Sequence, residues 1–460
     1  MLFLALLVAA APFQFHIDVA EFPNAVYHLG CLSGRSPCTK REIEKFWHGD
    51  LHWKNADQRQ LDAWTAALDS LAGRQPKPPE SPFLPNYANF YPGLRAVNRI
   101  IAAGLDSRSP AEFRKHAATL ASANEIAQIS AALAYFQQRL RPWWRSKGQP
   151  YAAAHQRSVQ TAMDAPGVSV TADRIARFME SEITNREYRI DLIPRSDPKS
   201  DGATATVVGN HLLIEVTDAG ETADALPFMM HELTHALYDL APLRLHQQLI
   251  RDFGSASEPN SQPLYSILNE GIATAVQINL MRQAMPDQDV YRDPFIPRIG
   301  RAVSGSLARA LDNGPTLFHG FFDTYFRASA AELKEELASP LFNLSSAMPL
   351  SIGKLDEAEK ACHSYLATHW TGDFADRNRF PEVNLLVLIT YDMLDAISDN
   401  WSEIIPLSQV HRGFAFVAPR NTKGRWYVLA GKDDGAVVDV VKRLAAIRTG
   451  ASDGVLLTID

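Results

Sequence analysis

Two histidines four residues apart are the clearest chemical feature of this 460-residue sequence. His231 and His235 lie in the segment FMMHELTHALYDL, and Glu232 follows the first histidine directly. On a helix, positions i and i+4 lie one turn apart on the same face, so two imidazoles at this spacing can bind one metal ion. Glu232 lies about 100° around the helix from His231, where its carboxylate can accept a proton from water without ligating the metal. The spacing therefore predicts a metal site with an adjacent general base.

A zinc ion that catalyses hydrolysis needs a third protein ligand and one open position for water. The sequence offers Glu270 for this role, within the segment LYSILNEGIATAVQ. Its neighbours Gly271 and Ala273 are small enough to let two helices approach closely. An unpaired charge in this mostly apolar segment would be costly, so the carboxylate is expected to have a partner. The sequence predicts that this partner is the metal, with a buried ion pair or a helix-end carboxylate as the alternative.

A helix over residues 228–240 is expected to present the two histidines. Pro227 suits an early helical position, and Pro242 suits the end of the helix. At about 100° per residue, the apolar side chains form one stripe, and His231 and His235 project from the opposite side. The stripe consists of Leu226, Met230, Leu233, Leu237 and Leu240. The histidines are therefore not part of the ordinary core face.

The segments on either side of this helix have patterns of their own. Before it, ATATVVGNHLLIEVTD contains two β-rich runs joined by Gly209-Asn210, a pattern typical of a hairpin. After it, a second helix is expected from Leu264 to Ala284, ended by Met285-Pro286. The histidine helix is thus predicted to lie in sequence between a hairpin and the helix that carries Glu270.

The length of the chain favours two or three domains, at roughly 150 residues for each domain. Patterns such as QRQLDAWTAALDSLAG and ANEIAQISAALAYFQQRL predict a helical domain over residues 12–165. Residues 166–290 form the predicted catalytic core. Residues 291–460 form a predicted, mainly helical C-terminal domain, whose tail is expected to contain a strand, a turn and a helix. The predicted fold class is α+β and mostly helical.

The N-terminal segment MLFLALLVAAAPF is too short to span a bilayer, but it is long enough for the apolar part of a signal peptide. We expect residues 1–11 to be removed on export, which predicts a periplasmic or secreted protein. Because Lys and Arg are missing before the apolar run, a buried N-terminal strand or helix, or a misassigned start, is the alternative. Cys31 and Cys38 enclose a short loop that could close as a disulfide after export, whereas three reduced thiols, with Cys362, are the alternative.

Composition and charge narrow the set of partners. An apolar content of 46% is near the average for globular proteins and indicates a folded protein. The net charge of -7 and the absence of a long Lys/Arg run argue against nucleic acid or an acidic membrane as the main partner. We expect a substrate that is not polyanionic, no nucleic acid and no stable membrane span.

The segment HELTHALYD followed by NEGIA resembles the gluzincin metallopeptidases, the clan of thermolysin, over residues 217–277. The resemblance implies a zincin-like core. Such a core consists of a small β-sheet with an edge strand, an active-site helix and a helix that carries the ligand glutamate. Carried over to the matching positions, it implies that His231, His235 and Glu270 bind a zinc ion (Zn2+). It also implies that Glu232 is the general base.

The same resemblance suggests residues that would orient these ligands. Asn269 resembles the family residue that helps to hold the second histidine. The family has an Asp four residues after the ligand Glu to orient the first histidine, whereas this chain has Thr274. The resemblance therefore implies that the orienting residue is either Thr274 or Asp239, which lies one turn beyond His235. The alternative is that the ligands are oriented by a different arrangement.

Other candidate residues are less well defined by their spacing. The resemblance implies that an edge strand before the active helix pairs with extended peptide, and HLLIEVTD is the candidate, although a purely structural strand is equally compatible. No spacing selects a residue that stabilises the transition state. The candidates are His319, His363, His369, Tyr265 and Tyr391. His48 and His52 are also four apart, but Gly49 between them and the missing carboxylate argue against a second metal site.

The predicted function is therefore that of a zinc-dependent metallopeptidase that uses Glu232 as general base and acts on a peptide or protein substrate. One alternative is a zinc hydrolase that acts on a non-protein amide or ester, because the same chemistry serves these bonds. Another is a non-catalytic binding protein with a zincin fold. The presence of Glu232 argues against the binding protein, since a site that only binds metal does not need this carboxylate.

Overall fold

The structure is a computed structural model that describes most of the chain. The described residues are 12–35, 38, 40–74, 92–165, 167–183, 186–199, 205–218, 225–255, 264–265, 267–281, 295–334, 347–366, 372–373, 385–397, 403–419, 425–447 and 453–460. The predicted signal peptide, residues 1–11, lies outside them.

The described residues fall into two compact units. The first unit contains those up to Pro242 together with Arg309–Leu317, and the second contains Leu243–Ala308 and Phe318–Asp460. The boundary at Pro242 lies inside the predicted core of residues 166–290, whose limits stay a prediction.

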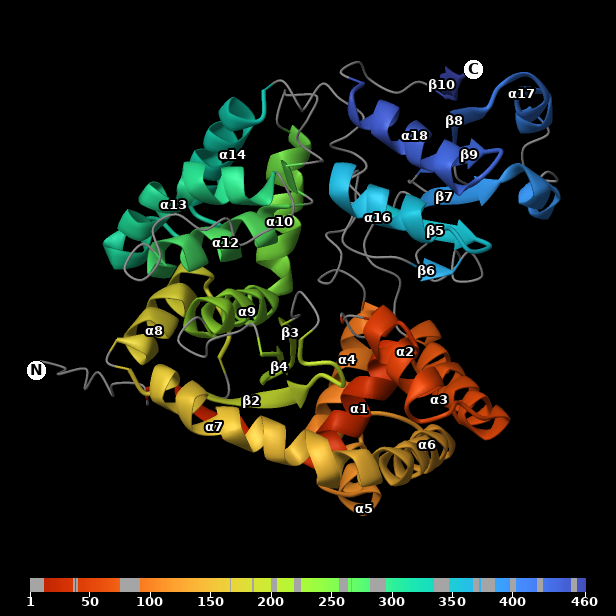
Figure 1. The fold of residues 1–460 in the computed structure, drawn as a ribbon. Helices are drawn as coiled ribbons and strands as arrows, with labels where there is room; N and C mark the ends of the chain where they lie inside the picture. Colours follow the sequence, from red (N-terminus) through yellow and green to blue (C-terminus); the bar gives the residue numbers. More distant parts are fainter. Residues whose placement is uncertain are drawn as a thin grey trace, which may run out of the picture. The chain divides into compact units, whose positions relative to one another are not determined.

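The first unit is built on a four-stranded sheet (Figure 1). Its strands are β1 (Gln14–Asp18), β2 (Glu187–Pro194), β3 (Ala205–Val208) and β4 (His211–Val216), in the order β1-β2-β4-β3. Strands β1, β2 and β4 run parallel, and β3 runs antiparallel to β4. The predicted hairpin is confirmed, because Val208 pairs with His211 across a two-residue turn in which Gly209 has a φ of 62°.

One prediction about these strands is wrong and another is incomplete. Strand β4 pairs with both β2 and β3, so HLLIEVTD is not an edge strand, and β3 lies at the edge instead. Strand β1 shows that residues 12–165 are not entirely helical, since Phe15 and Ile17 are buried at alternate positions of a strand. In both cases the parallel partner comes from a distant part of the sequence, which a local pattern does not reveal.

Helices pack on both faces of this sheet (Figure 1). The helices of this unit are α1 (Glu21–Leu32), α2 (Lys40–Gly49), α3 (Asn55–Gly73), α4 (Pro92–Leu105), α5 (Pro110–His116), α6 (Ala123–Trp143), α7 (Gln149–Met163), α8 (Val168–Phe178) and α9 (Ala225–Asp239), with one π-helical turn, η1 (Trp144–Gly148). Helix α7 packs against β1 and β2, and α9 packs against β3 and β4. Residues of α1 to α6 share one apolar core with Ile193, Val208 and Leu213 of the sheet. The two helices predicted most clearly in this region, α3 and α6, are confirmed.

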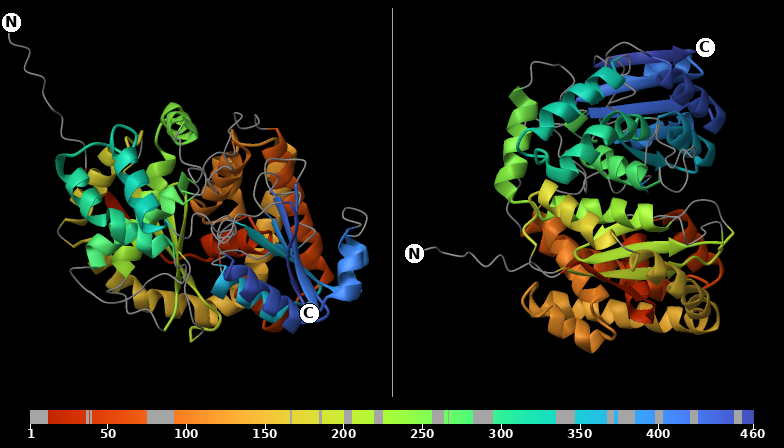
Figure 2. Two further views of the ribbon diagram at one scale, coloured as in Figure 1. Left: turned by 90° about the horizontal axis from the view of Figure 1, so that it is seen from above. Right: turned by 90° about the vertical axis from the view of Figure 1, so that its left-hand side faces the viewer.

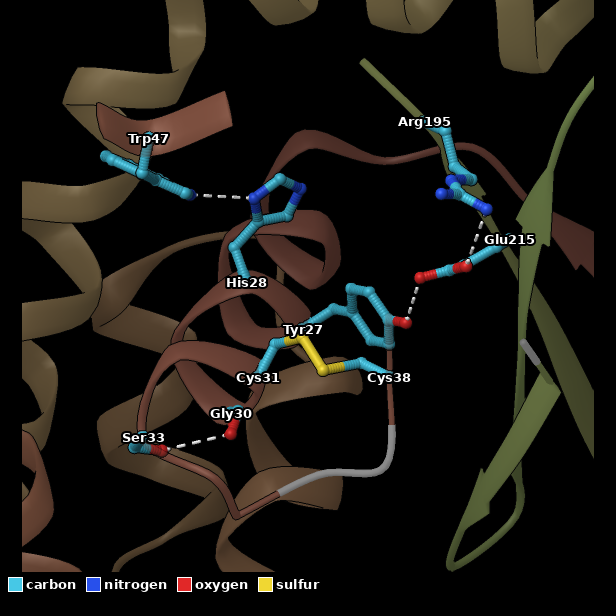
Figure 3. The surroundings of a disulfide bond; sticks show 9 residues. All are labelled: Tyr27, His28, Gly30, Cys31, Ser33, Cys38, Trp47, Arg195 and Glu215. Carbon is cyan, nitrogen blue, oxygen red and sulfur yellow. Dashed lines mark hydrogen bonds and ion pairs between the residues drawn. A yellow bond between two sulfur atoms is a disulfide. The ribbon is translucent and has the colours of Figure 1, made fainter. Parts of the chain in front are cut away.

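Helix α1 is buried along almost its whole length and joins the sheet to the surrounding helices (Figure 3). The hydroxyl group of Tyr27 donates a hydrogen bond of 2.7 Å to Glu215 of β4. The indole of Trp47 on α2 donates a hydrogen bond of 2.9 Å to Nδ1 of His28. Burial lowers the pKa of His28 to about 3, so this imidazole is a neutral acceptor at neutral pH.

The first two cysteines are paired in the structure. Cys31 at the end of α1 and Cys38 form a disulfide in which the Cα atoms are 5.8 Å apart (Figure 3). Cys362 is a buried thiol that takes no part in a disulfide. Of the two alternatives that the sequence left open, the structure contains the disulfide.

The second unit begins with a group of helices. They are α10 (Leu243–Ser255), α12 (Leu268–Met281), α13 (Ile296–Asn313), which continues past the unit boundary, and α14 (Phe321–Glu332). Within the predicted helix of residues 264–284, α12 accounts for the main part. The prediction that small residues permit a close helix approach is confirmed for α12 and α13. A Cβ atom added to Gly271 would lie 2.8 Å from Ile299, and one added to Gly300 would lie 2.7 Å from Thr274.

The rest of the second unit contains a six-stranded sheet. Its strands are β5 (Met348–Ile352), β6 (Gly372–Asp373), β7 (Leu385–Thr390), β8 (Gly413–Pro419), β9 (Arg425–Gly431) and β10 (Gly454–Ile459), in the order β10-β8-β9-β7-β5-β6. Helices α16 (Asp356–Tyr365) and α18 (Asp434–Ala445) lie side by side against it (Figures 1 and 2). The helices η5 (Tyr391–Ala396) and α17 (Ile404–Val410) connect β7 to β8.

Local sequence patterns predict only one part of this sheet. The predicted strand, turn and helix of the tail are β9 and α18. The other strands were missed within a region expected to be mainly helical. The reason is visible in LLVLIT of β7, where the residues from Leu385 to Ile389 are all buried. A continuous apolar run carries no period that separates a central strand from a buried helix.

At the level of fold class the prediction is confirmed, since the chain is mostly helical and has two small mixed sheets. No helix among the described residues is both long enough and apolar enough to span a membrane.

Candidate metal centre

Helix α9 presents the two histidines much as the sequence predicts. It extends from Ala225 to Asp239, close to the expected range of residues 228–240. In the middle of the expected apolar stripe, Met230, Leu233 and Leu237 are buried. The end of the stripe differs, because Leu240 lies beyond the last helical residue and is 37% exposed.

The rings of His231 and His235 converge on one point. Their Nε2 atoms are 3.0 Å apart, and the ring planes are inclined at 82°. Two nitrogen ligands of a tetrahedral zinc ion would be separated by about 3.3 Å, with each Zn–N bond about 2.0–2.1 Å long. A hydrogen bond between a protonated and an unprotonated ring nitrogen also has a length near 3.0 Å. The two nitrogens are therefore close to the separation that a shared ion requires.

Glu232 completes a group of three side chains that could hold a metal ion. The possible ligand atoms of His231, Glu232 and His235 all lie within 4.8 Å of one another. It is the one such group of His, Cys, Asp and Glu side chains found in the part of the chain that the structure describes. His231 is 3% exposed, and His235 is half-buried. The donor set of two imidazoles and a carboxylate fits a divalent cation such as zinc.

Two further side chains share the face of α9 that carries the histidines. Phe228, about one turn before His231, is 40% exposed and offers an apolar surface beside the cluster. Asp239, one turn after His235, is half-buried. Its predicted role in orienting a histidine stays a prediction.

The predicted third ligand lies on α12 in the second unit. Glu270 occupies the first turn of this helix and is half-buried. On either side of it, Asn269 and Thr274 are buried, at 7% and 3% exposure. Among the described residues, Oδ1 of Asn269 and Oγ1 of Thr274 have no hydrogen-bond partner. Buried polar atoms of this kind are costly and mark the turn around Glu270 as a polar place in an apolar helix. The role of Glu270 as ligand stays a prediction.

The other predicted candidates gain no support. The hydroxyl group of Tyr391 donates a hydrogen bond of 2.8 Å to the carbonyl of His411, and Tyr265 is fully buried. His319 is exposed, while the His363 side chain and His369 lie outside the described residues.

The histidine pair at the end of α2 also has an ordinary environment. The ring of His48 stacks on Trp53 with the centroids 5.0 Å apart. His52 has a positive φ of 52°, and its carbonyl accepts a hydrogen bond from Arg139. These contacts are those of structural residues.

A second cluster surrounds a histidine that the sequence patterns did not single out. His211, at the start of β4, lies between Asp191 of β2 and Asp106, which follows α4. A signal was present in the strand segment YRIDLIP, where Asp191 stands among apolar residues. A carboxylate at such a position is expected to have a charged partner, but only the fold shows which one.

Comparison of the chain with models of protein families, with curated proteins and with solved structures found no match in any of the three.

Proposed function

We propose that the protein is a zinc-dependent metallopeptidase, which hydrolyses peptide bonds with a water molecule as the attacking group. The observation that carries this proposal is the convergence of the Nε2 atoms of His231 and His235, 3.0 Å apart, with the carboxylate of Glu232 beside them. Glu270 is proposed as the third ligand on the strength of the segment NEGIA. Two histidines and a glutamate are a ligand set typical of hydrolytic zinc sites.

A zinc ion bound by these residues would lower the pKa of a water molecule and polarise the carbonyl group of the substrate. We propose that Glu232 accepts the proton of the attacking water and passes it to the leaving amine. Its position on α9, about 100° around the helix from His231, suits a base beside the ion better than a ligand of the ion. His231 and His235 are held in place because the opposite face of α9 is anchored in the core by Leu233 and Leu237.

The edge strand β3 supports a peptide as the substrate. Among the described strands β3 pairs only with β4, so its outer edge has main-chain groups with which an extended peptide can pair. Strand β3 also packs against α9, the helix that carries Glu232. The exposed ring of Phe228 offers an apolar contact for a substrate side chain. The Cys31–Cys38 disulfide supports a periplasmic or secreted location for this activity.

Metal content and peptide hydrolysis, measured on the same preparations, test this proposal. We expect one zinc per chain in the wild-type protein and a loss of both zinc and hydrolysis in His235→Ala and Glu270→Ala. His48→Ala is the matched control, because His48 only stacks on Trp53 and its loss should leave zinc and activity unchanged.

The possible results separate the alternatives. Zinc that is retained at wild-type stoichiometry in both variants, with folding intact, would contradict the ligand assignment. Hydrolysis of esters or cell-wall amides but not of peptides would change the substrate class. Bound zinc without any hydrolysis would favour a binding protein.

A further inference from the structure

His211 is held between two carboxylates inside the first unit. Its Nδ1 atom lies 2.7 Å from Oδ2 of Asp191, and its Nε2 atom lies 3.3 Å from Oδ1 of Asp106. The His211 side chain is fully buried, Asp191 is almost so, and the side chain of Asp106 is 38% exposed. An imidazole with a carboxylate at each nitrogen binds both best when it carries a proton on each nitrogen. We refer to these three residues as the His211 clamp.

Further charged groups surround the clamp from each neighbouring element. Arg189 of β2 forms an ion pair of 3.6 Å with Asp106, and Arg108 forms an ion pair with Asp18 of β1. The charge of Asp191 also acts on Asp18, and that of His116 acts on Asp106. With His211 protonated, the three carboxylates of Asp18, Asp106 and Asp191 are balanced by three cations, those of His211, Arg108 and Arg189. Loss of the proton from His211 would leave the negative charge in excess.

The clamp acts at the base of the β3–β4 hairpin. His211 is the first residue of β4 and directly follows the turn formed by Gly209 and Asn210. The same turn lies against α4, since a Cβ atom added to Gly209 would be 3.3 Å from Cβ of Ala102. Asp191 ties the hairpin to β2, and Asp106 ties it to the end of α4. The hairpin therefore has a charged attachment on both sides at one end.

We propose that His211, as an imidazolium held by Asp191 and Asp106, is a positioning residue that fixes the β3–β4 hairpin and so aligns the edge strand β3 beside α9. This inference rests on the proposed function, because it gives β3 the role of binding extended peptide next to Glu232. Pairing between main chains needs a strand held in register and position, so a loosened hairpin weakens peptide binding more than it changes the metal site.

The protonation of His211 follows from its surroundings. Burial by itself lowers the pKa of this imidazole, but the hydrogen bond to Asp191 and the charges of Asp191 and Asp106 outweigh burial and raise it to about 9. The reciprocal effect is seen at Asp106, whose pKa is lowered chiefly by its close contact with His211. The clamp is thus closed at neutral pH and opens as the pH rises through 9.

Steady-state peptide hydrolysis by His211→Gln tests the proposal, since glutamine has a similar size but carries no charge. We expect KM at pH 7.5 to rise roughly five-fold or more, with kcat and zinc content near the wild-type values. In the wild-type enzyme KM should rise between pH 8 and 10, and this pH dependence should be missing in His211→Gln. His16→Gln is the control. His16 of β1 pairs with Arg189 of β2, which in turn pairs with His211 of β4, so the two histidines lie in the same row of the sheet. The side chain of His16, unlike that of His211, is exposed. An unchanged KM, or a loss of zinc and kcat instead, would overturn the proposal.

Hydrogen exchange separates a failure of this inference from a failure of the proposed function. At pH 7.5 the backbone amides of residues 205–216 should exchange faster in His211→Gln than in His16→Gln, whether or not any peptide is hydrolysed. If exchange in the hairpin is equal in the two variants, His211 does not fix it, even in an active peptidase. If exchange differs but the wild-type protein neither binds zinc nor hydrolyses peptide, the clamp holds the hairpin for some other purpose and the positioning role is wrong.

Discussion

His28 and His211 are both fully buried in the first unit, yet their imidazoles have opposite preferences for a proton. His28 accepts a hydrogen bond from the indole of Trp47 and lies among the aromatic rings of Tyr27, Phe46 and Trp47. Its pKa is lowered to about 3 by burial, because no charge in the described part of the chain offsets the cost of a buried imidazolium. His211 has a carboxylate at each ring nitrogen, and its pKa is raised to about 9 despite burial. The partners of a buried histidine, and not burial alone, decide its charge.

The histidines of α9 represent a third environment. His231 and His235 face each other through their Nε2 atoms, 3.0 Å apart, with the carboxylate of Glu232 nearby. This separation is close to that of two nitrogen ligands of one zinc ion, so the arrangement suits a cation between the rings. The comparison therefore separates a neutral structural histidine, a charged structural histidine and a pair available to a metal.

The largest expected effect concerns the third environment. Glu232→Gln retains the size of the side chain and removes the base, so turnover should fall by about 10²-fold to 10⁴-fold while zinc content stays at the wild-type level. Peptide hydrolysis and elemental analysis of the same sample measure both quantities. Unchanged turnover in a zinc-loaded variant would show that Glu232 is not the base.

Acid should destabilise the protein through His28. In the folded state the pKa of His28 is below its unfolded value near 6.5, so the folded state binds this proton less well than the unfolded state does. The contribution of neutral His28 to stability is therefore fully present above about pH 6.5 and decreases as the pH falls towards 3. From pH 7 to pH 4 the free energy of unfolding should decrease by about 3 kcal/mol because of this group. Urea unfolding at both pH values should show a smaller loss in His28→Gln than in the wild type. Equal losses in the two proteins would mean that His28 does not govern the acid response.

Alkali should act through His211 in the opposite direction. Since the folded pKa is above the unfolded value, the stabilisation is complete below about pH 6.5 and disappears as the pH rises through 9. Between pH 7 and pH 10 the loss should be about 2.5 kcal/mol. The free energy of unfolding of His211→Gln should be lower at pH 7 and should depend less on pH over this range. If the free energy of unfolding of the variant depends on pH as steeply as that of the wild type, a group other than His211 causes the alkaline response.

The smallest effect is expected where a buried hydrogen bond involves no histidine. Tyr27→Phe removes the donor to Glu215, which still lies 3.9 Å from Arg195. The loss should be about 1.5 kcal/mol, the usual size for a hydrogen bond to a charged group. Burial and the charge of Glu215 raise the pKa of Tyr27 well above 10, so this loss should be the same at pH 5 and pH 9. Chemical denaturation at the two pH values would detect a pH-dependent difference, which would contradict this assignment.

The sequence by itself determined the features that depend on local spacing. The positions of His231, Glu232 and His235 on one helix follow from the 3.6-residue period, and α9 confirms the helix that this requires. The hairpin at Gly209-Asn210 follows from turn chemistry, because few residues other than Gly and Asn adopt the backbone conformation of a two-residue turn. Helices α3 and α6 follow from long amphipathic patterns.

Only the tertiary structure decided the features that depend on distant partners. Strand β4 is central and β3 is the edge because β2, from an earlier segment, occupies the other side of β4. The buried strands of the six-stranded sheet have no local period that distinguishes them from helix. His211 is charged because the fold brings Asp191 and Asp106 to its two nitrogens, across 20 and more than 100 positions of the chain. Local spacing determines which side chains share a face, whereas electrostatics and strand order depend on contacts that only the folded chain creates.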